Sequence, residues 1–99
     1  MNTPQNLKQV SSISAVFPAY NDAGTIPSMV LQALIALRKV TSDYEIVVTN
    51  DGSKDSTAEV LNELASRYPE LKVIHHPQNE GYGCALRTGF ANSTKDWIF

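Results

Sequence analysis

Acidic and amide side chains recur in three short polar segments of this 99-residue sequence. Each segment directly follows a short apolar run, and the segments span residues 18–24, 50–55 and 77–83. Carboxylates and amides in such segments can accept hydrogen bonds from a base or a ribose, or hold a divalent metal. The candidate side chains are Tyr20, Asn21, Asp22, Asp51, Ser53, Asp55, Asn79 and Glu80. Each is also an ordinary turn or helix-cap residue, so the functional signal is the recurrence of the pattern after each apolar run.

The stretch at residues 45–57 shows this arrangement most clearly. The β-branched residues at 46–48 predict a buried strand. Ser56 and Glu59 have the spacing of a capping box, so we expect a helix to begin at Ser56. Asp51 would then lie at the carboxyl end of a parallel-type strand, which is where ligands bind in open α/β sheets.

The elements that position these segments alternate between strand and helix. Apolar runs predict strands at residues 12–17, 44–49 and 71–75, and a fourth strand that begins at Trp97. Helical spacing of apolar residues predicts helices at residues 25–40, 56–68 and 85–92. This alternation predicts an α/β fold: a parallel, Rossmann-like sheet in a three-layer arrangement with helices. The three polar segments would then share one edge of the sheet.

The first predicted helix, at residues 25–40, is apolar over most of its surface. Thr25 could act as its N-cap, and Pro27 is tolerated in a first turn. A helix that is apolar on most sides is usually buried on more than one side, and we expect that here.

The sequence is long enough for one domain. Residues 1–11 are polar and predict a flexible N-terminal tail, which leaves residues 12–99 as the domain. The fourth strand is cut three residues after it begins, so we expect an N-terminal segment of a longer protein. Such truncation would expose an edge strand and helix faces, which predicts self-association or marginal stability.

The composition excludes several classes of protein. The net charge of −2 gives no case for nucleic-acid binding. The single cysteine, Cys84, excludes an internal disulfide and suits a reducing compartment, so we expect a cytoplasmic location. The polar N-terminus lacks the apolar core of a signal peptide, and no apolar run approaches the roughly 20 residues of a membrane span.

Three further features favour structural roles. The glycines at residues 81–86 suggest a dinucleotide-binding fingerprint, but Leu86 stands where that motif needs glycine or alanine, and the segment follows the third strand. His75 and His76 are adjacent and lack a nearby cysteine cluster, so a structural or surface role is favoured over metal binding. Cys84 has no evident base and is expected to be a small buried apolar residue.

Three motifs in register resemble signature segments of family 2 glycosyltransferases. Residues 15–22 (AVFPAYND) resemble their Pro-x-Tyr-Asn-Glu segment, residues 47–57 their Val-Asp-Asp-Gly-Ser-x-Asp segment, and residues 79–90 their third loop and following helix. The resemblance covers about residues 12–99 and is strongest to the subgroup that glycosylates polyprenyl or dolichyl phosphate. It implies the N-terminal, nucleotide-binding part of a GT-A fold and a nucleotide-diphosphate sugar as donor, linked to UDP or GDP. It also implies inversion at the anomeric carbon and a divalent metal, Mg or Mn, under the diphosphate.

The resemblance also implies roles for individual residues. The nucleoside site would be lined by Pro18, Tyr20 and Asp22, the base contacted by Asp51 with Thr49 and Gly52 in the same segment, and the ribose and phosphates approached by Gly81, Gly83 and Arg87. Asn50 replaces the first Asp of the family pair and Asp22 replaces the usual Glu, so we expect a tuned site. The metal-binding Asp-x-Asp and the catalytic base of the family would follow Phe99, so no catalytic or metal residue is expected within this chain.

Two other classes of protein fit part of the sequence. A nucleotidyltransferase or another α/β nucleotide-binding domain would share the strand and loop pattern, but a Gly-Lys-Ser/Thr phosphate loop is missing. An α/β interaction module without a ligand would suit the apolar helix at residues 25–40.

If the acceptor is a polyprenyl phosphate, as the resemblance to family 2 glycosyltransferases implies, the full-length protein would associate with a membrane.

Overall fold

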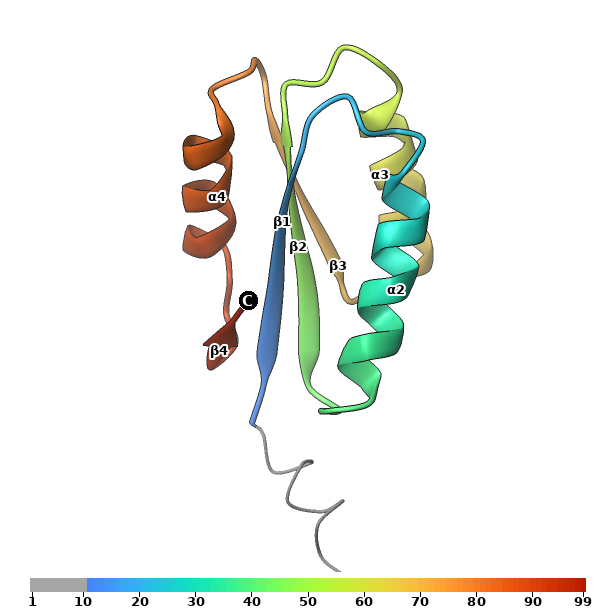
Figure 1. Ribbon diagram of the computed structural model, residues 1–99, viewed down its shortest axis with the longest axis vertical. Helices are drawn as coiled ribbons and strands as arrows, with labels where there is room; N and C mark the ends of the chain where they lie inside the picture. Colours follow the sequence, from blue (N-terminus) through green and yellow to red (C-terminus); the bar gives the residue numbers. More distant parts are fainter. Residues whose placement is uncertain (1–10) are drawn as a thin grey trace, which may run out of the picture.

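The computed structural model describes residues 11–99, which form one parallel sheet with helices on both faces (Figure 1). The elements in chain order are β1 (Ile13–Ala19), α2 (Ile26–Arg38), β2 (Tyr44–Asp51), α3 (Thr57–Arg67), β3 (Leu71–His76), α4 (Tyr82–Ala91) and β4 (Trp97–Ile98). The four strands are parallel and lie in the order β3-β2-β1-β4. The predicted α/β fold with a parallel three-layer sheet is therefore confirmed. The predicted tail at residues 1–11 lies, apart from Ser11, outside the described residues.

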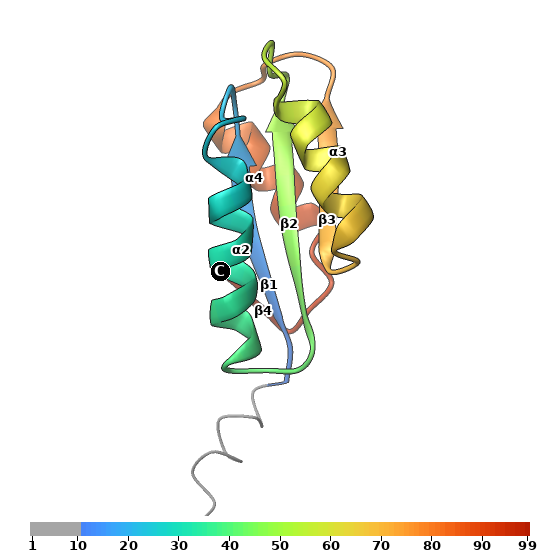
Figure 2. The same ribbon diagram turned by 90° about the vertical axis from the view of Figure 1, so that its right-hand side faces the viewer.

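The helices divide between the two faces of the sheet (Figures 1 and 2). Helices α2 and α3 pack side by side on one face, and α4 packs on β1 and β2 from the other face. The loops after β1 and β2 therefore turn to one side of the sheet, and the loop after β3 turns to the opposite side (Figure 1).

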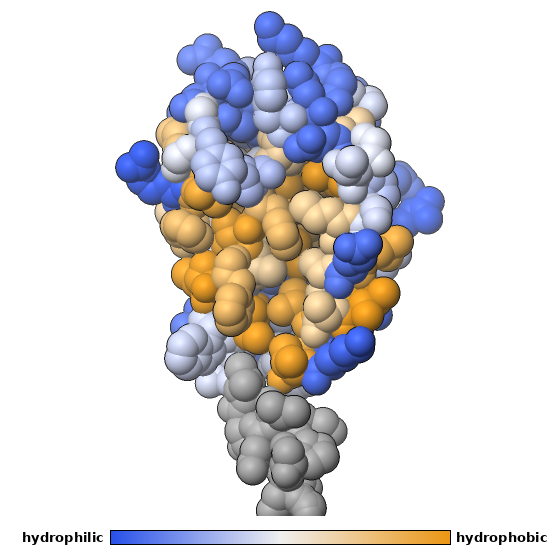
Figure 3. Space-filling view, in the orientation of Figure 1, coloured by the Kyte–Doolittle hydropathy of each residue, from blue (hydrophilic) through white to orange (hydrophobic). Residues whose placement is uncertain are grey.

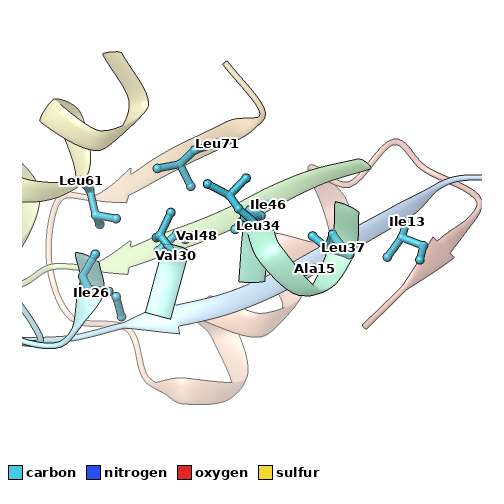
Figure 4. Close-up of a cluster of buried hydrophobic side chains, with 11 residues drawn as sticks. Ile13, Ala15, Ile26, Val30, Leu34, Leu37, Ile46, Val48, Leu61 and Leu71 are labelled. Atoms are coloured by element: carbon cyan, nitrogen blue, oxygen red, sulfur yellow. The ribbon is translucent and has the colours of Figure 1, made fainter. Parts of the chain in front are cut away.

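The main core lies between the sheet and the α2–α3 layer (Figure 4). It is built from isoleucine, valine, leucine and alanine side chains of β1, β2, α2, α3 and β3, namely Ile13, Ala15, Ala19, Ile26, Val30, Leu34, Leu37, Ile46, Val48, Leu61 and Leu71. Helix α2 contributes one buried stripe, as amphipathic spacing requires. The expectation that α2 is buried on more than one side is wrong, because Leu31 is 43% and Ile35 is 56% exposed.

Strand β1 does not end before Pro18, as expected, but runs through it to Ala19. The backbone N–H and C=O groups of the even-numbered residues of β1 point toward β4: Phe99 N donates to Ser14 O at 2.8 Å, and Val16 N donates to Phe99 O at 2.7 Å. Pro18 lies on this same side, beyond the residues of β4 that pair with β1. Its missing N–H therefore removes no ladder hydrogen bond, which is the condition under which proline is tolerated in a strand.

Helix α3 begins at Thr57, and its cap differs from the predicted capping box. The side chain of Ser56 makes no cap hydrogen bond. Asp55 Oδ1 instead accepts the N–H of Thr57 at 2.9 Å. A carboxylate one position earlier than Ser56 therefore pairs with a first-turn N–H that has no partner inside the helix. Thr25 likewise makes no side-chain cap of α2, because its hydroxyl donates to the carbonyl of Asp22 at 3.3 Å.

Apolar side chains gather over the middle of the face shown in Figure 3, between α4 and α2. At the edge of the sheet, Trp97 is 58%, Ile98 44% and Phe99 74% exposed. Exposed apolar patches of this kind favour association. None of the helices within residues 11–99 is both long and apolar enough to cross a bilayer.

We expect the chain to associate as its concentration rises, because this exposed edge offers both apolar area and unpaired backbone groups. Sedimentation velocity at increasing concentration measures the effect. Phe99→Ser should weaken the association while leaving the fold intact, since the Phe99 side chain is mostly exposed and its backbone bonds to β1 remain. A sharp monomer boundary at all concentrations would contradict the prediction.

Candidate functional site

A cleft of about 350 Å³ opens at the carboxyl ends of the strands. It is lined by Pro18, Ala19, Tyr20, Asp22, Asp51, Asn79, Gly81, Tyr82 and Ala85. These residues come from the end of β1 and the loop after it, the end of β2, the loop after β3 and the first turn of α4. The cleft thus lies where the loops after β1 and β3 diverge to opposite faces (Figure 1), which is where open α/β sheets bind ligands.

Asp51, the last residue of β2, organises the floor of this cleft. Its Oδ1 accepts hydrogen bonds from His76 Nδ1 at 2.9 Å and from the backbone N–H of Glu80 at 2.8 Å. Its Oδ2 accepts the backbone N–H of Gly81 at 2.9 Å. The residue is only 3% exposed. The carboxylate therefore fixes the loop after β3 at the N-terminus of α4, where negative charge is favourable.

The surroundings of Asp51 also set its acidity. Burial by itself raises the pKa of this carboxyl, but the hydrogen bonds from His76 and from the N–H groups of Glu80 and Gly81 outweigh it and lower the pKa below its ordinary value. Asp51 is therefore ionised at neutral pH, as an acceptor of three N–H donors must be.

We expect the stabilisation from Asp51 to be lost in acid. Because its folded pKa is lowered, this stabilisation is complete above the unfolded pKa of about 3.9 and disappears as the pH falls through the folded pKa. The melting temperature should fall less steeply between pH 7 and pH 3 for Asp51→Asn than for the natural sequence. Other carboxyls with a lowered pKa, such as Glu45, contribute equally to both proteins. Parallel curves for the two proteins would contradict the prediction.

The loop after β1 is anchored on the turn after β2. Asn21, at a φ of 53°, donates its N–H to Ser53 Oγ at 2.9 Å. Its side-chain Oδ1 accepts the N–H of Lys54 at 2.9 Å, and asparagine is one of the few residues other than glycine that adopt this left-handed backbone. The N–H of Asp22 donates to Thr57 Oγ1 at 2.9 Å. These cross-links hold one wall of the cleft in place.

Asn50, which departs from the family pattern, lies behind the turn and does not line the cleft. It is 3% exposed, and its Oδ1 accepts the N–H of Ser53 at 3.2 Å. Its Nδ2 lies 3.0 Å from His75 Nδ1. An amide at this position thus shapes the turn and bonds to β3.

The cleft brings together a subset of the residues expected to bind the donor. Pro18, Tyr20, Asp22, Asp51 and Gly81 line it.

The other residues expected to bind the donor lie outside the cleft lining. Thr49 is fully buried against Gly89 of α4, and its Oγ1 has no hydrogen-bond partner among the described residues. Gly52 forms the turn behind the cleft, at a φ of 68°. Gly83 and Arg87 are exposed on α4 outside the lining.

Sequence reasoning left out three residues that line the cleft, namely Ala19, Tyr82 and Ala85. Tyr82 is 70% and Tyr20 is 42% exposed, so two aromatic side chains are available to a ligand. Extending β1 through Pro18 would have placed Ala19 at the strand end. Helix α4 begins at Tyr82 and not at the expected Ala85, and this shift brings its first turn to the cleft.

The predictions for Cys84 and the histidines have different outcomes. Cys84 is not buried, and its Sγ donates to Glu80 Oε1 at 3.3 Å. The hydrogen bond to Glu80, with burial, raises the pKa of the thiol, which makes it less reactive. Both His75 and His76 hydrogen-bond to side chains of neighbouring elements, in keeping with the expected structural role.

Within residues 11–99, no three His, Cys, Asp or Glu side chains are grouped so that they could hold a metal ion. The Asp51 carboxylate is already occupied by three N–H donors. The described residues therefore do not form a divalent-metal site by themselves.

The fold is that of the N-terminal part of GT-A structures. A mannosyltransferase from Pyrobaculum calidifontis, solved in complex with GDP-Man and Mn²⁺, matches with a TM-score of 0.71 and 24% identity over 83% of this chain and 24% of that one. S. aureus TarS matches with a TM-score of 0.70 and 22% identity, over 88% of this chain and 26% of its own.

The sequence profile described as Glycosyl transferase family 2 matches residues 14–99, and the chain belongs to this family. A dolichyl-phosphate beta-glucosyltransferase of Trichomonas vaginalis is 35% identical over 84% of this chain and 26% of its own length. An undecaprenyl-phosphate 4-deoxy-4-formamido-L-arabinose transferase of Pectobacterium atrosepticum is 35% identical over 93% of this chain and 28% of its own. The chain thus spans about a quarter of the length of these relatives and matches their N-terminal part.

Proposed function

We propose that this chain is the donor-binding segment of an inverting glycosyltransferase, which transfers a sugar from a nucleotide-diphosphate sugar to an acceptor. The observation that carries the proposal is the cleft at the strand ends, lined by the Pro18, Tyr20, Asp22, Asp51 and Gly81 positions of the family motifs. The Pyrobaculum structure with GDP-Man supports a nucleotide-sugar donor.

The chemistry of the lining suits the nucleoside end of the donor. Hydrogen-bond acceptors predominate in the lining. Among residues 11–99, Asp22 Oδ2 accepts one hydrogen bond, from the N–H of Tyr20 at 3.2 Å. Asn79 Nδ2 donates to Asp51 O at 3.3 Å, which leaves the Asn79 amide oxygen for a ligand. A base N–H or a ribose hydroxyl can donate to these oxygens. No lysine or arginine of residues 11–99 lines the cleft, so the diphosphate would extend away from it.

The two exposed tyrosines provide the apolar contact. Tyr20 lines the cleft from the loop after β1, and Tyr82 lines it as the first residue of α4. Aromatic rings stack on bases irrespective of the base. The described residues hold a nucleoside in place, while transfer needs groups that they lack.

Chemistry by the full-length enzyme would use a divalent metal, Mg or Mn, with its main ligands beyond Phe99. The named activities of the relatives favour a polyprenyl phosphate as acceptor, which would bring the full-length enzyme to a membrane, and the 99-residue chain alone would be inactive.

We expect weak binding of UDP or GDP, with Tyr82→Ala reducing the affinity about five- to tenfold through loss of stacking. An NMR titration of the chain with UDP and GDP measures it, and shifts should concentrate at residues 18–22, 51 and 79–85. Phe90→Ala is the matched control, because Phe90 is an aromatic residue of α4 that is 47% exposed and lies outside the cleft. Shifts scattered over the surface, or equal losses in the two variants, would reject the proposal.

A further inference from the structure

The chain has two histidines, and they are adjacent at the end of β3. Successive side chains of a strand point to opposite faces, and the two rings accordingly contact different helices. His75 Nε2 lies 2.9 Å from Asn62 Oδ1 of α3. His76 Nε2 lies 2.9 Å from Thr88 Oγ1 of α4.

The hydrogen-bond partners of His75 fix its proton on Nε2. Asn50 Oδ1 accepts the N–H of Ser53, so the other end of that amide, the Nδ2 donor, faces His75 Nδ1 at 3.0 Å. Nδ1 must then accept and carry no proton. Nε2 carries the proton and donates it to the Asn62 oxygen.

The partners of His76 require the opposite arrangement. Its Nδ1 faces Asp51 Oδ1 at 2.9 Å, and a carboxylate can only accept, so Nδ1 carries the proton. In the neutral ring, Nε2 then accepts the hydroxyl proton of Thr88 at 2.9 Å. The side chain of His76 is 10% exposed and that of Asp51 is 4% exposed, so little water competes for these bonds.

We propose that the two histidines are held in opposite tautomers and act as positioning residues for the two loops that build the cleft. His76, oriented by Thr88, holds the Asp51 carboxylate against the N–H groups of Glu80 and Gly81. His75 holds Asn50, and through it the turn at Ser53 that anchors the loop after β1. The positioning role rests on the proposed donor site, but the tautomers do not.

The tautomers are tested by ¹⁵N NMR of the chain labelled in histidine, at pH 8 and without ligand. We expect one ring protonated on Nδ1 and one on Nε2, with His75→Gln removing the Nε2-protonated signal. Two rings protonated on the same nitrogen, or rings that exchange rapidly between their two tautomers, would overturn the proposal.

The positioning role is tested at Thr88, which lies outside the cleft lining. Thr88→Val keeps the shape but removes the hydroxyl, while Thr88→Ser keeps the hydroxyl. We expect Thr88→Val to shift the N–H resonances of Glu80 and Gly81 and to let the ring of His76 exchange between its two tautomers. The same variant should weaken UDP or GDP binding about three- to tenfold, the effect of one neutral hydrogen bond. Thr88→Ser should restore all three readouts.

The outcomes separate the positioning role from the proposed function. Unchanged Glu80 and Gly81 resonances in Thr88→Val would overturn the positioning role whether or not nucleotide binds. Unchanged nucleotide affinity in that variant would also overturn it. Absence of nucleotide binding to the natural sequence, with the Thr88→Val shifts present, would reject the proposed function and support the positioning of the loop.

Discussion

Replacing Gly52 with alanine is expected to destabilise the chain by about 2–4 kcal/mol, the sum of a left-handed backbone penalty and of overpacking. Gly52 has a φ of 68°, and a Cβ at this position would lie 2.2 Å from the backbone carbon of Gln78 and 2.3 Å from Asn79 N. Backbone atoms cannot rotate away as a flexible side chain can. The turn after β2 would therefore have to separate from the loop after β3, which forms part of the cleft.

Thermal and urea unfolding followed by circular dichroism measure this loss. Gly24→Ala is the matched control, because a Cβ at Gly24 would meet nothing within 4 Å and its φ is not positive. That control should be neutral or slightly stabilising, since alanine reduces the freedom of the unfolded chain. Equal stability of Gly52→Ala and Gly24→Ala would show that the two loops are not packed as described.

Replacing Asp51 with asparagine is expected to cost about 1.5–3 kcal/mol, the range for hydrogen bonds to a charged group. An amide has about the same shape, but its NH₂ group would face one of the N–H donors that the carboxylate now accepts. The loop at Glu80 and Gly81 would lose its anchor. Nucleotide affinity should therefore fall at least tenfold, even though the carboxylate is almost fully buried.

Asp43→Asn provides the comparison for Asp51→Asn in unfolding and in nucleotide titration. Asp43 is exposed, and its side chain pairs with Lys95 at 2.7 Å, an arrangement worth at most about 1 kcal/mol. Stability and affinity should remain close to those of the natural sequence. If Asp51→Asn behaved like Asp43→Asn, the carboxylate would have no organising role.

The strands and helices could be predicted because their signals are local. The β-branched run at residues 46–48 and the helical spacing of Val30, Leu34 and Leu37 indicate which face is buried without reference to the rest of the chain. Alternation of these elements, with the right-handed crossover rule, then places the three polar segments at one edge. That reasoning located the cleft.

The internal partners of the cleft residues could not be predicted, because they depend on contacts between distant segments. Asp51 was expected to bind a base, but its carboxylate is bonded to residues 25 to 30 positions away. Thr49 alternates to the α4 face of β2, where the close approach of Gly89 buries it. Asp51 accepts the N–H of Gly81, the residue just before α4, and that long-range contact has no sequence pattern of its own.

The hydrogen bonds that join Asn21 to the turn after β2 and Asp22 to the first residue of α3 have a thermodynamic consequence. They order the wall of the cleft during folding, so the binding of a nucleotide does not carry the entropic cost of ordering that wall. Folding and binding then depend on the same contacts, and a ligand that binds only the folded chain raises its melting temperature by mass action. Each substitution that loosens these loops should weaken affinity in proportion to the local stability that it removes.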